Sequence, residues 1–143
     1  MQTLETLLRR WGKRGVWWLG NRPNVRQGQL AKAIAAQVGY PTSDTDPFSN
    51  GGLYQVDLKQ AAHVLAVAAT TSLAYGDPSP RQSALQEAKA ALKDFGDDAV
   101  FLSNGLWNMN SRGWNPLTSA TFDCGVIGYD TDHAFIFWVE EED

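Results

Sequence analysis

The residues of this chain best suited to catalysis are two histidines and one cysteine, and each also has a plain structural interpretation. His133 stands beside Asp130 and Asp132, and the three could be a metal or acid–base cluster. Aspartate is favoured in tight turns, and a metal site needs more ligands than this segment offers, so we interpret it as a turn. Cys124 with His63 could form a nucleophile pair, but an unpaired cysteine usually packs as a small apolar side chain.

Longer motifs that carry a known chemistry are missing from the sequence. It has no phosphate-binding glycine loop, no dinucleotide fingerprint, no zinc-protease helix motif and no nucleophile elbow. A single cysteine also excludes an internal disulfide framework and a multi-cysteine zinc site. We therefore expect no catalytic set, no metal and no cofactor. A small enzyme that uses His63 or His133 with carboxylates stays as a second alternative.

Charge is distributed unevenly along the chain. Of the 12 Lys and Arg residues, seven lie in the first 39 positions, whereas 15 of the 16 Asp and Glu residues lie after them. The formal net charge of the whole chain is −4. Such an asymmetry predicts two electrostatically different surfaces, and it usually concerns binding partners rather than the fold.

The acidic residues and two of the six tryptophans suggest one binding surface in the C-terminal part. Four consecutive acids occupy positions 140–143, either as a solvated tail or as a strip that docks on a cationic enzyme surface. Tryptophan favours interfaces when its N–H group finds a partner, although the plainer interpretation is that these rings fill a core under long loops. The predicted partner-binding residues are Trp107, Trp114, Asp123, Asp130, Asp132, Glu140, Glu141 and Glu142.

The basic N-terminal part supports an alternative, a nucleic-acid-associated regulator. Its cations follow a short amphipathic pattern, and Trp11, Trp17 and Trp18 could stack on unpaired bases. An acidic sequence pI near 5.1 opposes this interpretation, although a local basic patch could still act. The predicted nucleic-acid-binding residues are Arg9, Arg10, Lys13, Arg14, Arg22 and Arg26, with Lys32 close by.

Hydrophobic periodicity predicts helices in the first two thirds of the chain and strands in the last third. One helix follows a Thr3 cap, and later helices follow caps at Asp57 and Ser79. The C-terminal strands form a hairpin around a two-residue turn, which places Asp123 opposite Glu140. The predicted helices cover positions 3–14, 26–38, 57–75 and 79–96, and the predicted strands cover 16–19, 99–102, 121–129 and 133–140.

These elements predict one α+β domain over residues 1–143, with about four helices on one face of a small antiparallel sheet. Within it we distinguish a basic helical part (1–39), a helical hairpin (57–96) and a C-terminal β part (98–143) that ends in a β-hairpin. No apolar run reaches the roughly 18 residues of a membrane span, and the N-terminus lacks the apolar core of a signal peptide, so we expect a cytoplasmic protein without a membrane partner.

The composition and the missing catalytic motifs favour a binding protein over an enzyme. We expect a small acidic inhibitor, similar in kind to an immunity protein, an antitoxin or a phage-encoded inhibitor. Its acidic hairpin and tryptophan-bearing loop would dock on a partner with a basic surface, such as a toxin or a nuclease-type enzyme, because complementary charge speeds encounter and sets specificity.

Overall fold

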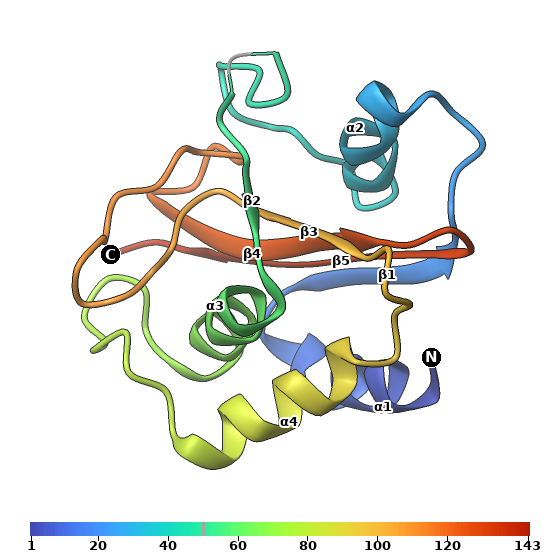
Figure 1. The fold of residues 1–143 in the computed structure, drawn as a ribbon. Helices are drawn as coiled ribbons and strands as arrows, with labels where there is room; N and C mark the ends of the chain where they lie inside the picture. Colours follow the sequence, from blue (N-terminus) through green and yellow to red (C-terminus); the bar gives the residue numbers. More distant parts are fainter. Residues whose placement is uncertain (50) are drawn as a thin grey trace.

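A five-stranded antiparallel sheet forms the middle layer of the molecule, in the order β1-β5-β4-β3-β2 (Figure 1). The structure is a computed structural model that describes residues 1–49 and 51–143. The predicted α+β class is confirmed, with the C-terminal hairpin at the centre of the sheet rather than at its edge. The strands are β1 (Val16–Asn21), β2 (Tyr54–Val56), β3 (Val100–Ser103), β4 (Phe122–Tyr129) and β5 (His133–Glu141).

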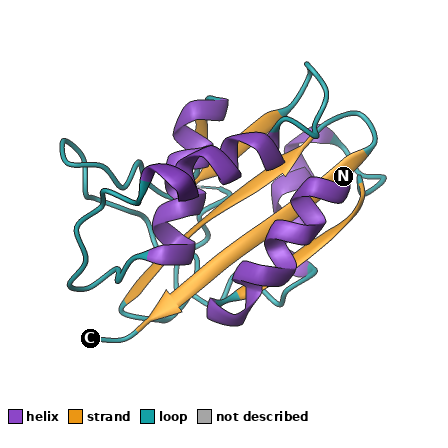
Figure 2. Cartoon of the chain, turned by 90° about the horizontal axis from the view of Figure 1, so that it is seen from below, coloured by secondary structure: helices purple, strands orange, loops and turns teal. Residues whose placement is uncertain are grey.

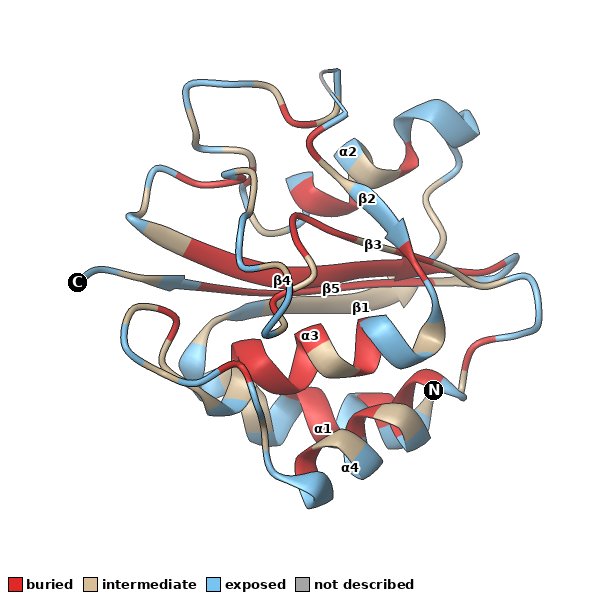
Figure 3. Ribbon diagram, turned by 60° about the vertical axis from the view of Figure 1, so that its left-hand side comes forward, coloured by how far each residue is buried: buried red, intermediate tan, exposed pale blue. Residues whose placement is uncertain are grey.

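The β4–β5 hairpin has the predicted register. Asp130 faces His133 across the turn, and Asp123 faces Glu140 at the far end of the ladder. Figure 3 shows both strands buried along most of their length, because each of their faces is covered by helices or loops. Residues on both faces of this hairpin therefore belong to a core.

Three helices cover one face of the sheet, and a fourth covers the other (Figures 1 and 2). Leucines of α1 (Gln2–Trp11), α3 (Leu58–Thr70) and α4 (Gln82–Leu92) share one apolar cluster with Phe135 and Phe137 of β5. The expectation of helices on one face holds for these three.

The helix α2 (Leu30–Ala36) differs from that expectation. Its buried Leu30 and Ile34 pack in a second cluster with Ile136 and Trp138, the β5 residues that point away from the other helices. The pleat of β5 places successive side chains on opposite faces, so an apolar strand of this kind needs cover on both sides. Two short 3-10 helices, η1 (Gly12–Arg14) and η2 (Gln27–Gln29), precede β1 and α2.

The predicted start of α3 is confirmed, whereas the predicted starts of α1 and α4 are wrong. Asp57 accepts the backbone N–H of Gln60 and Gln60 reaches back to Asp57, which is a capping box. The N-cap of α4 is Arg81 rather than Ser79, and the N-cap of α1 is Met1 rather than Thr3. The α-amino group of Met1 instead lies 3.6 Å from the Asp94 carboxylate.

The edge strand β2 was not predicted, because its three residues lie between the predicted loop 40–52 and the predicted helix at Asp57, in a stretch that was assigned to no element. It pairs with β3 and extends the sheet toward the segment 104–118. The longest described helix, α3, has 13 residues, and none of the described helices has the length and apolarity to cross a bilayer.

Candidate functional site

A buried carboxylate holds the long loop 104–118 against the sheet. Asp123 of β4 is fully buried. Asn104 Nδ2 and Trp138 Nε1 each donate to Asp123 Oδ1 at 2.9 Å. The backbone N–H groups of Leu117 (3.1 Å) and Thr118 (3.2 Å) and the Thr118 hydroxyl (3.0 Å) complete the shell. Both ends of the loop are therefore tied to one side chain of the hairpin.

Hydrogen-bond donors, rather than a cation, make the opposed Asp123–Glu140 pair tolerable. Burial raises the pKa of Asp123, although its N–H and O–H donors oppose that rise. Glu140 accepts the Tyr40 hydroxyl at 2.8 Å, and burial together with this bond raises the pKa of Tyr40. Like charges facing each other across a ladder are normally destabilising. Here each carboxylate has donors of its own.

Three aromatic rings stack along the outer side of this loop. The Trp107 and Trp114 ring centroids lie 5.2 Å apart, and those of Trp114 and Phe122 also lie 5.2 Å apart. Trp107 is buried, with a left-handed backbone (φ 52°), and its carbonyl oxygen lies 2.6 Å from Nε2 of His63 on α3. A left-handed conformation is uncommon for a bulky residue. Trp107 thus anchors the stack, while Trp114 and Phe122 remain half-exposed.

The stack forms one wall of a pocket of about 200 Å³, which we call the aromatic pocket. The opposite wall is the connection between α3 and α4, residues 71–78, with Val67 behind it. The lining is mostly apolar, and Arg112 supplies its one charged group. Pockets of this kind bind apolar groups and use a few polar groups to orient them.

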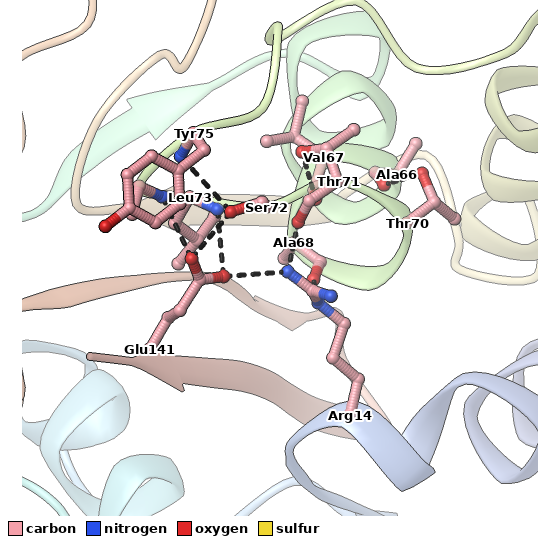
Figure 4. Close-up of polar contacts among 11 residues, drawn as sticks. Arg14, Ala66, Val67, Ala68, Thr70, Thr71, Ser72, Leu73, Tyr75 and Glu141 are labelled. Carbon is pink, nitrogen blue, oxygen red and sulfur yellow. Dashed lines mark hydrogen bonds and ion pairs between the residues drawn. The ribbon is translucent and has the colours of Figure 1, made fainter. Parts of the chain in front are cut away.

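An ion pair fixes the 71–78 wall of the aromatic pocket (Figure 4). The Glu141 carboxylate accepts the Ser72 hydroxyl (2.7 Å), the N–H groups of Leu73 (2.9 Å) and Ala74 (3.0 Å), and Arg14 Nη2 (3.1 Å). Burial would raise the pKa of Glu141, but these N–H and O–H donors and the Arg14 charge outweigh it, so the pKa lies below its ordinary value.

Arg14 also binds the carbonyl groups at the end of α3. Its Nε donates to the Ala68 carbonyl at 2.7 Å, and its Nη2 donates to the Thr71 carbonyl. The last carbonyl groups of a helix lack partners within it, so a cation at this end is favourable. We call Arg14, Glu141 and residues 68–74 the Arg14–Glu141 clamp.

The predicted acidic residues do not gather into one patch. Asp130 is buried in the β4–β5 turn, where it accepts the N–H groups of Gly96 (2.9 Å), His133 (2.7 Å) and Asp132 (2.9 Å). Burial opposes its ionisation, but these bonds hold its pKa below the ordinary value. The prediction that Asp123, Asp130 and Glu141 contact a partner is therefore corrected. Their carboxylates accept hydrogen bonds from groups within the chain instead.

Three of the predicted acids remain exposed. Asp132 lies in the β4–β5 turn, whereas Glu140 and Glu142 lie at the opposite end of β5. Glu142 also accepts the backbone N–H of Thr121 at 3.3 Å, directly before the pocket residue Phe122. The acidic groups beside the aromatic pocket are therefore those at the end of the chain.

The predicted basic residues are also dispersed. Arg10 pairs with Glu87 of α4, and Arg9 lies 3.7 Å from Glu5 and above the Trp17 ring. Arg14 belongs to the clamp. In a second group, Arg22 lies over the Tyr129 ring, and Lys13 and Arg26 are exposed.

The structure does not bring the catalytic candidates together. His63 contacts the Trp107 carbonyl, while His133 lies 3.7 Å from Asp130 in the distant turn. Cys124 is fully buried, and burial raises the pKa of its thiol. Among the residues that the structure describes, no three His, Cys, Asp or Glu side chains are placed to share a metal ion.

Sequence reasoning found the two tryptophans but missed the rest of the aromatic pocket. Phe122 was read only as a strand residue. Residues 71–75 of the other wall were predicted as the end of a helix, whereas α3 ends at Thr70. Arg112 did have a sequence signal, because it is the only Lys or Arg after position 93. The chain matches no known protein-family model, and searches of curated proteins and of solved structures also found no match.

Proposed function

We propose that this chain is a protein-binding module of the inhibitor kind, which takes up an apolar side chain of its partner in the aromatic pocket. The observation that carries the proposal is the pocket wall itself. Trp114 and Phe122 stay partly exposed in a stack whose buried side-chain polar atoms all have hydrogen-bond partners. Rigid aromatic side chains that line a preformed pocket are typical anchors of protein interfaces.

The surroundings of the aromatic pocket extend its apolar surface. Tyr75, at the 71–78 wall, is 81% exposed, and Met109, beside Arg112 on the other wall, is 61% exposed. Neighbouring exposed apolar side chains of this size are more typical of an interaction site than of an inert surface. A small ligand would need only the pocket. The exposed apolar surface around the pocket therefore favours a macromolecular partner.

The charge around the pocket supports a basic partner, in a narrower form than the sequence predicted. Glu142 lies beside Phe122 through the Thr121 contact and exposed Asp143 follows it in the chain, whereas the buried acids of the hairpin contribute no contact surface. Arg112 is the single cation of the lining. A partner with an apolar anchor and cations facing the chain end fits this arrangement, and we propose a toxin or a nuclease-type enzyme as its class.

The two alternatives receive less support. A nucleic-acid regulator would need its six predicted cations to act together, but Arg9, Arg10 and Arg14 pair with Glu5, Glu87 and Glu141. Only half of that predicted set, Lys13, Arg22 and Arg26, lies outside these ion pairs. An enzyme needs a converging set of reactive groups, and the two histidines have separate surroundings.

Affinity capture with pocket variants tests this proposal. Ala74→Leu narrows the pocket without touching the stack, and Trp114→Ala removes the middle ring. Ala36→Leu adds the same bulk on an exposed position of α2 and serves as the matched control. We expect the parent chain and Ala36→Leu to retain one protein from lysate of the native cells, and both pocket variants to lose it at least tenfold, as for an interface anchor.

The salt dependence of the captured complex tests the charge component. A basic partner held partly by Glu142 and Asp143 should bind more weakly as salt rises, and Arg112→Gln should strengthen binding at low salt. Equal capture by the parent chain and both pocket variants, or capture of no protein at all, would overturn the proposed function.

A further inference from the structure

The outer edge of β1 is an open strand edge without the usual protection. β1 pairs only with β5, so half of its backbone N–H and C=O groups point away from the sheet. Among the described residues, no hydrogen bond joins that edge to another segment. Native proteins usually protect such an edge with lysine, proline or a bulge. β1 has the sequence VWWLGN and an unbroken register with β5, and it contains none of these devices.

The other edge of the sheet shows the contrast. β2 has three residues, and the loop 104–118 covers its end. Asn115 Nδ2 donates to the Tyr54 hydroxyl at 2.9 Å and to the Gly52 carbonyl at 3.2 Å. A short, covered strand is one of the recognised ways to block further pairing. Among the described strands, β1 is therefore the one with a long free edge.

Side chains on both faces of β1 give an added strand apolar contacts. Trp17 packs on the side of α1, below Arg9, and Trp18 packs on the side of α2, and both rings are half-exposed. Val16 is 38% exposed. Successive residues of an added strand would alternate between these two faces.

The charged residues around β1 indicate which charge a binding segment should carry. From position 6 to position 43 the sequence contains no Asp or Glu. Exposed Lys13 lies before the strand, and Arg22 and exposed Arg26 lie after it. At the far end of β1, Asp130 is occupied by backbone N–H groups, which leaves Asp132 as the exposed acid nearby. Cations thus flank both ends of the open edge.

A second copy of this chain fits the edge poorly. Two β1 strands related by a two-fold axis would run antiparallel, which would place Lys13 of one copy against Arg22 and Arg26 of the other. Like charges opposed across a ladder are destabilising.

We propose that the β1 edge binds an extended acidic segment of a partner protein by strand addition. Backbone hydrogen bonds to residues 16–21 would supply affinity, the two tryptophans would contact apolar side chains in the middle of the segment, and acids at its ends would face the flanking cations. This surface is separate from the aromatic pocket, and it does not depend on the function proposed for that pocket.

A titration with designed peptides tests the proposal on the intact chain. The probe is the peptide acetyl-Glu-Glu-Val-Thr-Val-Thr-Glu-Glu-amide. One control peptide replaces its four Glu by Lys, and another carries methyl groups on two adjacent central backbone nitrogens, so that neither of its edges can pair fully. We expect the acidic probe to bind, to protect the amides of residues 16–21 from hydrogen exchange, and to lose at least about tenfold in affinity in either control, because each removes a main binding contribution.

Charge variants of the chain give the matched comparison. Lys13→Gln with Arg26→Gln should raise the Kd of the acidic probe about tenfold, while Lys59→Gln with Lys93→Gln, which removes the same charge from exposed positions elsewhere, should change it less than about twofold. Ala74→Leu, which narrows the aromatic pocket, should leave probe binding unchanged, so failure of the pocket proposal would not affect this result.

Five outcomes would overturn the proposal. The first four are no binding of the acidic probe, equal binding of the lysine peptide, amide protection outside β1, and a dimer in solution that buries β1. Single-stranded oligothymidine that protects the same amides more strongly than the probe would also overturn it, in favour of nucleic acid.

Discussion

The Asp123 carboxylate lies in the core of this chain without a counter-cation, and donors from the surrounding loop and from Trp138 partly offset the burial that raises its pKa. Thr118 shows this most directly, since its hydroxyl and its backbone N–H both reach Asp123. Bonds of this kind to an ionised group contribute more than bonds between neutral groups. The buried network therefore has two roles, to satisfy the charge and to fix the loop that bears the aromatic pocket.

The substitution Thr118→Val tests the energetic part of that role. Valine has nearly the same shape but removes the hydroxyl that donates to Asp123 at 3.0 Å and accepts the Ala120 N–H at 3.1 Å. We expect the free energy of unfolding to fall by about 1.5–3 kcal/mol, the range for hydrogen bonds to charged groups. Urea denaturation followed by tryptophan fluorescence measures the change.

Thr121→Val is the matched control, because Thr121 also binds a carboxylate, that of Glu142, but on the surface. Its expected cost is below about 0.5 kcal/mol. If the two valine variants were equally stable, the buried network would not be an important source of stability.

At the residue scale the sequence predicted which residues are special better than it predicted their roles. Trp107 and Trp114 were singled out because tryptophans in an Asn/Gly-rich segment are conspicuous, and the structure stacks their rings, while their role in partner binding stays a prediction. Asp123 was taken as a surface acid, although its pairing with Glu140 was predicted. Its burial depends on Asn104, Leu117 and Thr118, which reach it from a loop of no regular pattern, so periodicity had no means to find it.

At the scale of elements, glycines let the central hairpin pack its largest side chain. Gly125 pairs with Trp138, and the indole ring lies directly above the glycine. A Cβ atom at position 125 would lie 2.1 Å from the Phe137 carbonyl oxygen and 2.4 Å from the Trp138 ring. Real Cβ atoms do not approach so closely, so a side chain here would require the strands to move apart.

We therefore expect Gly125→Ala to destabilise the chain by about 3 kcal/mol, at the upper end of the range for overpacked cores. Thermal unfolding followed by circular dichroism measures the effect. Gly28→Ala is the control, because a Cβ atom there meets nothing within 4 Å. That variant should match or slightly exceed the stability of the parent chain. A Gly125→Ala variant as stable as the parent would mean that β4 and β5 are not packed as described.

Long, strongly patterned elements were predicted, and short ones or their placements were not. The β-rich apolar runs of β4 and β5 and the turn between them specify the hairpin and its register. β2 is too short to show a period. The position of α2 on the second face of the sheet depends on the path of residues 22–29. The local sequence pattern does not indicate that path. Ser79 has the form of an N-cap, but the helix begins later because Arg81 keeps an extended backbone.

For the molecule as a whole, the charge asymmetry along the sequence is partly cancelled by folding. Arg10 and Arg14 from the basic part pair with Glu87 and Glu141 from the acidic part. The second pair joins η1, just before β1, to the end of α3 and the end of β5 (Figure 4). Basic and acidic residues far apart in the sequence thus form ion pairs within one domain. The composition alone could not distinguish this outcome from two separate binding surfaces.

The Arg14–Glu141 clamp should make the stability of the whole chain depend on acid pH. The pKa of Glu141 in the folded chain lies below its ordinary value of 4.5, so the unfolded chain binds the proton more readily. The contribution of Glu141 is then fully present above about pH 4.5 and is lost as the pH falls through the lowered pKa. Asp130 has a lowered pKa as well and adds a similar dependence.

The substitution Glu141→Gln isolates the contribution of the clamp. Glutamine keeps the size of the side chain but loses the charge that Arg14, Ser72 and two N–H groups stabilise. At pH 7 we expect a loss of about 1.5–3 kcal/mol, as for hydrogen bonds to a charged group. The difference between parent and variant should shrink steadily below pH 4.5, because the parent then becomes protonated, and Asp130 should leave both proteins with some remaining acid sensitivity. Urea denaturation at a series of pH values from 7 to 3 measures this difference.

Glu142→Gln, one residue further and exposed, should stay within about 0.5 kcal/mol of the parent throughout. A Glu141→Gln difference that stays constant down to pH 3 would contradict a clamp that depends on the ionised carboxylate.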